Sequence, residues 1–249
     1  MDGAPVFQMR FNPTGEQLAA ALNCEASVFL KTYGNTREQL ADEYGPYAAT
    51  SVFIGIYEPG GDAVGAVRLI RPSELGLKTL ADVARPPWSL DVPRMARAAR
   101  LDLDRTWDFT TLGARRGLRR WSALVSAGLF HGLVQAVRAN DITAAVMMID
   151  ERVRGLLALA GMTGQTMPGA RTATYMGSAR CTPVYEHCQQ AFDRQRQVNP
   201  DGYRLFMQGI GLDGISVPPL ADFRLRPMPA QRAGLPDAVP AGGGTPVPA

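Results

Sequence analysis

Hydrophobic and polar positions alternate with two different spacings along this chain. Between residues 14 and 32, side chains such as Leu18, Leu22 and Ala26 recur every three or four positions. This spacing places them on one face of a helix, so the segment is predicted to be an amphipathic helix. Residues 121–138 are instead apolar at almost every position, which is typical of a helix that is buried on all sides.

Extended segments follow a different pattern. Residues 51–57 and 63–70 are rich in β-branched and aromatic side chains and flank the turn-forming sequence EPGGD, which predicts an antiparallel hairpin. Residues 142–149 (ITAAVMMI) are apolar without interruption, as in a central strand that is covered on both faces. Further strands are predicted at 105–111 and 172–176, and further helices at 77–84, 150–159 and 183–196.

The order of these elements predicts the fold class. Helices alternate with extended segments, which favours an α/β fold with a mixed sheet over a helix bundle or a β-sandwich. Residues 227–249 contain six Pro and four Gly and almost no large apolar side chain, so this segment cannot offset the entropy lost on ordering. We therefore expect one folded domain over residues 1–225 and a flexible Pro/Gly/Ala-rich tail over 226–249.

Composition excludes several classes of protein. With 46% hydrophobic and 20% charged residues, the chain is expected to bury a core rather than remain disordered. Its longest apolar stretch is too short to span a bilayer and contains His131 and Gln135. The first residues show no secretory signal, so we expect a cytoplasmic protein. The three cysteines and two histidines lack the spacing of a metal site, and no metal is expected.

The net charge of the chain is small, but its positive charge is concentrated in one segment. The net charge of +3 is too small to indicate nucleic-acid binding, but residues 94–120 contain eight Arg and only three Asp. Within them, LGARRGLRR (112–120) connects a predicted strand to a predicted helix. Backbone N–H groups and the positive end of a helix dipole would meet there, which suits a pyrophosphate or a phosphopantetheine arm. The alternative is a glycine turn with solvated arginines.

The motifs around this loop resemble a known superfamily. TTLGARRGLRR (110–120), which lies between a predicted strand and a predicted helix and is followed by the predicted strand ITAAVMMID (142–150), resembles the acyl-CoA-binding motif of the Gcn5-related N-acetyltransferases (GNATs). Within that superfamily, AVGAVRLIRP (63–72) followed by DFTTLGA (108–114) resembles acyl-homoserine lactone synthases and long-chain N-acyl amino acid synthases. The resemblance implies a mixed, mostly antiparallel central sheet with a splayed strand pair, flanked by helices. The arm of an acyl-CoA, or the phosphopantetheine of an acyl carrier protein, would pass between the two splayed strands.

The resemblance also implies roles for particular residues. Asp108, and after it Glu43, are the expected bases, although each is also explained as a structural carboxylate paired with arginine. Arg68 is expected to orient a substrate carboxylate or to form an ion pair with Asp108 or Glu43. Substrate is further expected to contact Trp107, Thr110 and Thr111. The donor is expected to bind Leu112, Gly113, Ala114, Arg115, Arg116, Gly117, Leu118 and Arg119.

Other residues qualify this picture. The lactone synthases bind the cation S-adenosylmethionine through a run of acidic residues, of which this chain has only Glu43. Asp150 is expected to cap a helix, and Met147, Met148 and Phe53 are candidates, with Trp107, for lining an acyl tunnel. For the acid that protonates the leaving thiolate, only remote candidates appear, Tyr175 and Tyr185.

Together these features predict an acyltransferase. It would move an acyl group from acyl-CoA or an acylated carrier protein to the amine of a small-molecule acceptor. Two alternatives remain open at this point. The first is a catalytically silent relative that binds an acyl thioester or a protein partner, and the second is an acyl-homoserine lactone synthase.

Overall fold

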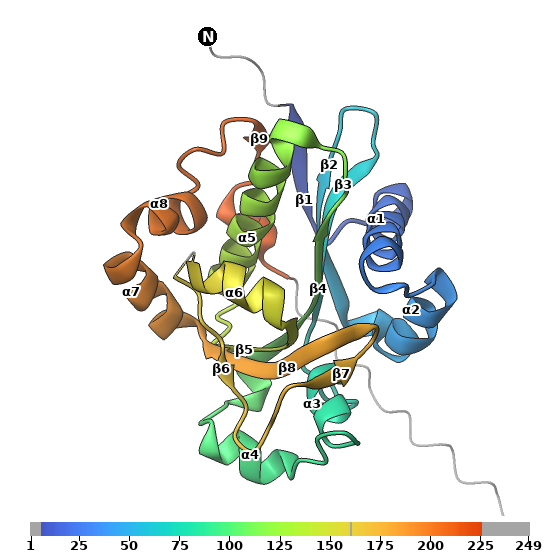
Figure 1. Ribbon diagram of the computed structural model, residues 1–249. Coiled ribbons are helices and arrows are strands. Elements are labelled where there is room, and N and C mark those ends of the chain that lie inside the picture. Colours follow the sequence, from blue (N-terminus) through green and yellow to red (C-terminus); the bar gives the residue numbers. More distant parts are fainter. Residues whose placement is uncertain (1–5, 160, 226–249) are drawn as a thin grey trace, which may run out of the picture.

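A twisted sheet with helices on both faces forms the molecule (Figure 1). The computed structural model describes residues 6–159 and 161–225, and the predicted tail lies outside these residues. Within the described part, nine strands form one sheet in the order β6-β8-β5-β4-β3-β2-β1-β9, with β7 paired to β8. The strands are β1 (Phe7–Phe11), β2 (Ser51–Tyr57), β3 (Ala63–Ile70), β4 (Thr106–Ala114), β5 (Ala144–Asp150), β6 (Gln165–Thr166), β7 (Ala173–Tyr175), β8 (Ser178–His187) and β9 (Ile215–Ser216).

The helices divide between the two faces of this sheet. α1 and α2 lie on one side of β2, β3 and β4, and α5 and α8 lie on the other (Figure 1). The mixed, mostly antiparallel sheet with flanking helices confirms the fold class predicted from the sequence. The helices are α1 (Gly15–Tyr33), α2 (Arg37–Tyr44), α3 (Lys78–Val83), α4 (Val92–Ala98), α5 (Ser122–Ala139), α6 (Glu151–Leu159), α7 (Cys188–Val198) and α8 (Pro200–Gln208).

β4 and β5 separate soon after they meet. They pair in parallel from Thr106 with Ala144 to Asp108 with Val146, yet β4 continues to Ala114 and β5 to Asp150. The opposite edges of both strands remain paired, β4 with β3 and β5 with β8. The two strands therefore form the splayed pair that the sequence motifs implied.

A β-bulge at Thr110 changes which side chains face the helices α1 and α3. Arg68 pairs with Thr111, whereas the next residue of β3 pairs with Phe109. Thr110 is thus an extra residue, and it reverses the alternation of side chains between the two faces of the strand. Asp108 and Thr111 consequently lie on the same face of β4, opposite Phe109, which packs in the core beneath α5.

α5 is apolar all round because other elements cover it on all sides. One side packs on β1, β2, β3 and β4, and α8 and the 3-10 turn Leu220–Phe223 cover the rest. Two glycines allow this close approach. A Cβ atom on Gly128 would lie 2.5 Å from Ile215, and one on Gly132 would lie 2.9 Å from Ile54. Larger side chains at these two positions would separate α5 from the sheet.

The structure corrects two predicted boundaries. Residues 183–187 belong to β8 rather than to a helix, and α7 begins only at Cys188. The reason is tertiary, since β8 pairs with β5 over the entire length of β5 and this pairing overrides local helix propensity. β4 also extends to Ala114, beyond the predicted end of the strand at residue 111, because it stays paired with β3 there.

Three further observations concern the described residues. No helix among them is long and apolar enough to cross a membrane. Their histidine, cysteine and acidic side chains form no group of three or more that could hold a metal ion. Cys24, Cys181 and Cys188 are buried free thiols.

Candidate active site

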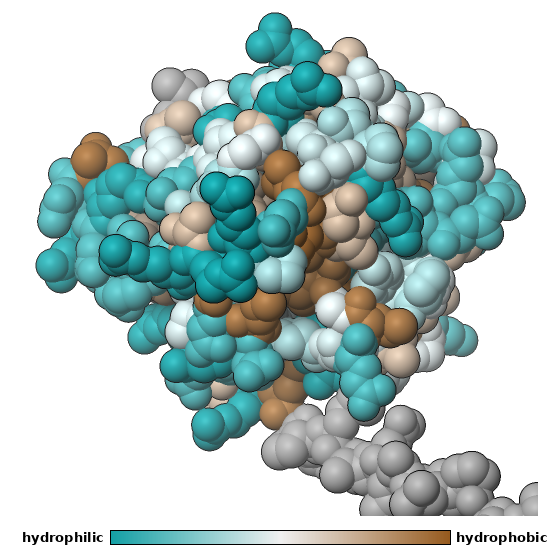
Figure 2. Space-filling view, turned by 90° about the horizontal axis from the view of Figure 1, so that it is seen from below, coloured by the Kyte–Doolittle hydropathy of each residue, from teal (hydrophilic) through white to brown (hydrophobic). Residues whose placement is uncertain are grey.

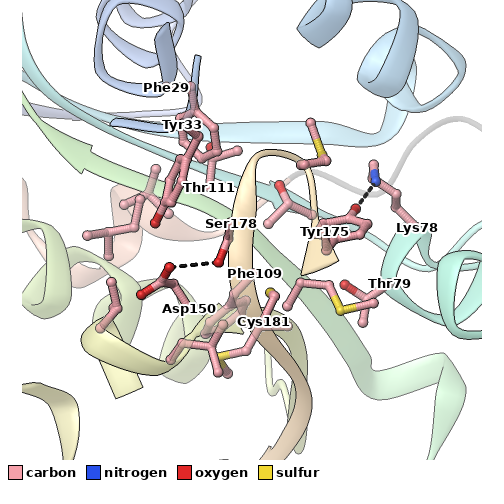
Figure 3. A pocket seen from close by; sticks show the side chains of 18 of the residues that line it. Phe29, Tyr33, Lys78, Thr79, Phe109, Thr111, Asp150, Tyr175, Ser178 and Cys181 are labelled. Atoms are coloured by element: carbon pink, nitrogen blue, oxygen red, sulfur yellow. Dashed lines mark hydrogen bonds between the residues drawn. The ribbon is translucent and has the colours of Figure 1, made fainter. Parts of the chain in front are cut away.

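A cavity of about 210 Å³ lies where β4 and β5 have separated (Figure 3). Residues 109–112 of β4 and 147–150 of β5 form two of its walls. Side chains of α1, α2, α3, α5, α6, β3 and the β7–β8 hairpin complete the cavity, and most of the lining is apolar. The splay is therefore a partly open, mainly hydrophobic space rather than a gap filled by side chains.

The predicted acyl-tunnel residues divide into two groups. Met147 and Met148 line the cavity, together with Phe109. Trp107 does not line it and packs in the core beneath α5. Phe53 also lies away from the cavity, with its ring 4.8 Å from the guanidinium carbon of Arg68.

A buried ion pair joins α1 to the sheet beside the cavity. Arg68 donates from Nε to Glu25 Oε1 at 2.9 Å and from a terminal nitrogen to Glu25 Oε2 at 2.5 Å. Thr111 donates its hydroxyl to the same carboxylate at 2.6 Å. The predicted ion pair of Arg68 with Asp108 or Glu43 is therefore wrong. Glu25 takes that position because it lies on the apolar face of α1, directly opposite β3.

A second buried cation, Lys78, lines the cavity at the start of α3. Its ammonium group lies 2.5 Å from Glu43, 2.6 Å from Asp82 and 2.6 Å from the hydroxyl of Tyr175. Tyr175 also lines the cavity and donates to Asp82 at 2.6 Å. Burial raises the pKa of Tyr175 above its usual range, so its hydroxyl stays protonated. Figure 3 shows Lys78 and Tyr175 side by side at one end of the cavity.

Asp108 lies behind the cavity wall. Its carboxylate is fully buried and accepts the backbone N–H of Thr79 at 2.5 Å and the Thr79 hydroxyl at 2.8 Å. Burial raises the pKa of Asp108 to about 7, although the hydrogen bonds from Thr79 act in the opposite direction. Thr79 itself lines the cavity, and its hydroxyl contacts Asp108.

Asp150 caps α6 and also lines the cavity. Its Oδ1 accepts the backbone N–H of Arg152 at 2.9 Å, which confirms the predicted cap on α6. Ser178 donates to Oδ2 at 2.7 Å (Figure 3). Hydrogen bonds from the Arg152 side chain lower the pKa of Asp150 to about 2, so the carboxylate is ionised. In Figure 3, Asp150 and Ser178 lie toward the left of the cavity and Lys78 and Tyr175 toward the right, and Tyr175 and Ser178 are paired neighbours in the β7–β8 hairpin.

The basic loop lies beyond this cavity, at the end of β4. Of its predicted donor-binding residues, Leu112 lines the cavity. Gly113 and Ala114 end the strand, and Arg115 turns toward Glu58 at 3.3 Å. The remaining residues, Arg116, Gly117, Leu118 and Arg119, lead through a short 3-10 turn into α5.

The structure splits the arginine-rich segment into two places. α4, with exposed Arg94 and Arg97, lies at the bottom of the molecule, whereas the loop before α5 lies at the top (Figure 1). On the lower face, hydrophobic side chains form a band between larger hydrophilic areas (Figure 2). The local excess of arginine in the sequence therefore does not make one continuous basic surface.

Sequence reasoning missed several polar residues of the site. Glu25 had a signal, because it is a charged residue among the apolar positions of an amphipathic helix. Lys78 and Thr79 had none, since their partners come from α2, β4 and β7, far away in the sequence.

Comparisons with known proteins bear on the fold. No protein-family model matches the sequence, and neither does any curated protein. Among solved structures, FeeM, an N-acyl amino acid synthase from uncultured soil microbes, is similar with a TM-score of 0.58 and 14% identity over 76% of this chain and 94% of FeeM. BjaI, a CoA-dependent acyl-homoserine lactone synthase, is similar with a TM-score of 0.53 and 16% identity over 89% of this chain and 97% of BjaI in its structure with SAM and isopentyl-CoA. The chain therefore shares the fold of FeeM and BjaI.

Proposed function

We propose that this chain is a cytoplasmic N-acyltransferase. It takes an acyl group from acyl-CoA, or from the phosphopantetheine of an acyl carrier protein, and transfers it to the amine of a small molecule. The observation that carries the proposal is the apolar cavity between β4 and β5, which opens where their pairing ends. The shared fold with FeeM and BjaI, which are named as enzymes of acyl transfer, supports it.

The two separated strand edges suit a pantetheine arm. Beyond Asp108 and Val146, β4 and β5 no longer pair with each other, so their facing N–H and C=O groups are available to a bound chain. A pantetheine arm is extended and carries two amide groups, which such edges bind as they would bind a strand. The apolar walls of the cavity suit the acyl chain.

In the transfer, the amine nitrogen forms a bond to the thioester carbonyl carbon and the carbon–sulfur bond breaks. One amine proton leaves, and the departing thiolate gains a proton. N–H groups on the free edge of β4 stabilise the negative charge on the carbonyl oxygen. For the amine proton we propose a route through the Thr79 hydroxyl to Asp108, whose pKa of about 7 suits proton transfer near neutral pH.

Thiol release tests the proposal directly. We expect the protein to release free thiol from acyl-CoA only when an amine is present, with the matching amide identified by mass spectrometry. A catalytically silent relative would bind the thioester without releasing thiol. Release of thiol at the same rate with and without amine would indicate a hydrolase and contradict the proposal.

Filling the cavity should weaken donor binding. Leu157 of α6 lines the cavity and is half-buried, so Leu157→Trp places an indole in the space for the donor. We expect the KM for acyl-CoA to rise about tenfold or more, because the indole occupies volume that the donor needs. The control is Leu156→Trp, since Leu156 is 67% exposed and outside the cavity wall. Equal effects from both variants would place the donor elsewhere.

The basic loop should recognise the phosphates of CoA. Replacing both exposed arginines, Arg116→Gln with Arg119→Gln, is expected to weaken acyl-CoA binding about tenfold and to leave acyl-pantetheine unchanged, since two exposed charge contacts are together worth about 1–2 kcal/mol. Calorimetry at low salt measures both ligands. The matched control removes Arg94 and Arg97 on α4, at the opposite end of the molecule. A loss with acyl-pantetheine as well would contradict a phosphate-binding role.

A further inference from the structure

The positive charges near the cavity already have acidic partners. Among the described residues, Lys78 and Asp150 are the charged side chains in the cavity wall. The ammonium group of Lys78 has three N–H donors. Glu43, Asp82 and the Tyr175 hydroxyl accept one each at 2.5–2.6 Å. A carboxylate entering the cavity would therefore find no remaining donor on Lys78.

The other buried cation, Arg68, is enclosed as well. Arg68 forms a two-point hydrogen bond with Glu25, and its guanidinium carbon lies 4.4 Å from the ring centre of Tyr44 and 4.8 Å from that of Phe53. Its side chain is only 6% exposed. The Glu25 carboxylate and the rings of Tyr44 and Phe53 therefore occupy the space around the guanidinium in which a substrate anion would have to bind.

The charges around the cavity sum to a negative value. Lys78 faces two carboxylates, Glu43 and Asp82, which leaves one excess negative charge. The pairs of Arg68 with Glu25 and of Arg152 with Asp150 are each neutral. Among the described residues, these cations are each paired with a carboxylate, so a substrate carboxylate would lose its hydration without gaining an unpaired cation, and the cavity disfavours it. An amine without a carboxylate meets no such penalty.

We propose that the acceptor is an amine that carries no carboxylate and has an apolar or aromatic body. The inference rests on the proposed acyl transfer and names the acceptor class for the same site. The apolar body would pack on Phe29, Tyr33 and Met176, which line the cavity from α1 and from the turn between β7 and β8. An acceptor of this class differs from the amino acids that the name of FeeM implies.

Matched pairs of acceptors test the proposal. Tyramine and tyrosine differ by the carboxylate, as do phenethylamine and phenylalanine, and the amino acid methyl esters keep the bulk without the charge. At equal concentrations of neutral amine, we expect kcat/KM to be at least tenfold higher for the amines and the esters than for the acids. Equal or better use of the acids would overturn the proposal.

A variant that changes the charge balance provides a second test. Glu43→Gln removes one of the two carboxylates on Lys78, and the Glu43 side chain is 35% exposed, so the fold tolerates the change. We expect the preference for tyramine over tyrosine to fall about fivefold or more. The matched control is Asp42→Asn, an exposed neighbour on α2, which should leave the preference unchanged. An unchanged preference in Glu43→Gln would contradict the charge argument.

Binding separates this proposal from the proposed function. If no amine releases thiol, the acyltransferase proposal fails, and calorimetry with tyramine and tyrosine still tests the acceptor class. Tighter binding of tyramine would support a site that excludes carboxylates. Tighter binding of tyrosine would overturn it, whatever reaction the protein performs.

Discussion

Arg68→Met is expected to lower the free energy of unfolding by about 3–5 kcal/mol. The substitution leaves the Glu25 carboxylate buried without its cation, and breaking a buried pair on one side costs about this much. The hydroxyl of Thr111 remains as one hydrogen-bond donor to Glu25, which is too little to replace a bidentate guanidinium. Urea unfolding followed by circular dichroism measures the loss.

The control for this prediction is the double variant Glu25→Gln with Arg68→Met. Removing both charges avoids the unpaired carboxylate, so most of the lost stability should return. Arg94→Met, at an exposed position on α4, should change stability by less than about 0.5 kcal/mol. A double variant as unstable as Arg68→Met would show that packing, rather than the unpaired charge, causes the loss.

Asp108→Asn is expected to lower kcat by about a hundredfold or more, the range typical of losing general-base catalysis. Asparagine keeps an oxygen for the backbone N–H of Thr79 but cannot accept the proton that the Thr79 hydroxyl passes on. The base acts when deprotonated, and burial raises its pKa to about 7. Activity of the unsubstituted protein should therefore rise up to about pH 7 and then level off, and this rise should disappear in Asp108→Asn.

The pH profile requires an acceptor that does not itself titrate in this range. An arylamine that stays uncharged above pH 5 meets this condition, and its amide product is measured directly. Thr79→Val removes the hydroxyl and should lower kcat to a similar extent. Thr79→Ser keeps the hydroxyl and should retain most of the kcat of the unsubstituted protein. If the activity of Asp108→Asn still rose fully with pH, Asp108 would be excluded as the proton acceptor. Its role would then be structural, as the hydrogen-bond acceptor for Thr79 at the start of α3.

Local sequence patterns predicted the strands and turns whose signals lie within a few neighbouring residues. The hairpin of β2 and β3 follows from its β-branched residues and the turn between them, and β5 follows from its uninterrupted apolar run. The continuation of β8 through residue 187 depends on pairing with β5, so a local reading assigned a helix there. The bulge at Thr110 also lacked a signal, because no glycine or proline marks it.

The candidate site was harder to predict than the fold. Met147, Met148, Thr110 and Thr111 line the cavity because they lie on the two strands whose motifs indicated a splay. The ion pairs could not be assigned from the sequence. The partner of Arg68 is 43 positions away on α1, and a choice among distant acidic residues depends on how elements pack rather than on their order in the chain.

The short contact between β4 and β5 has a mechanical consequence. Within the described residues, ladder pairing between the two strands covers residues 106–108 with 144–146, and one backbone hydrogen bond from Thr143 to Arg105 lies just before it. On their other edges, β4 is paired with β3 and β5 with β8, both in antiparallel fashion. We expect a molecule bound between the free edges to connect the two halves of the sheet and to restrict their relative motion, so that the protein is stiffer with the molecule bound than without it.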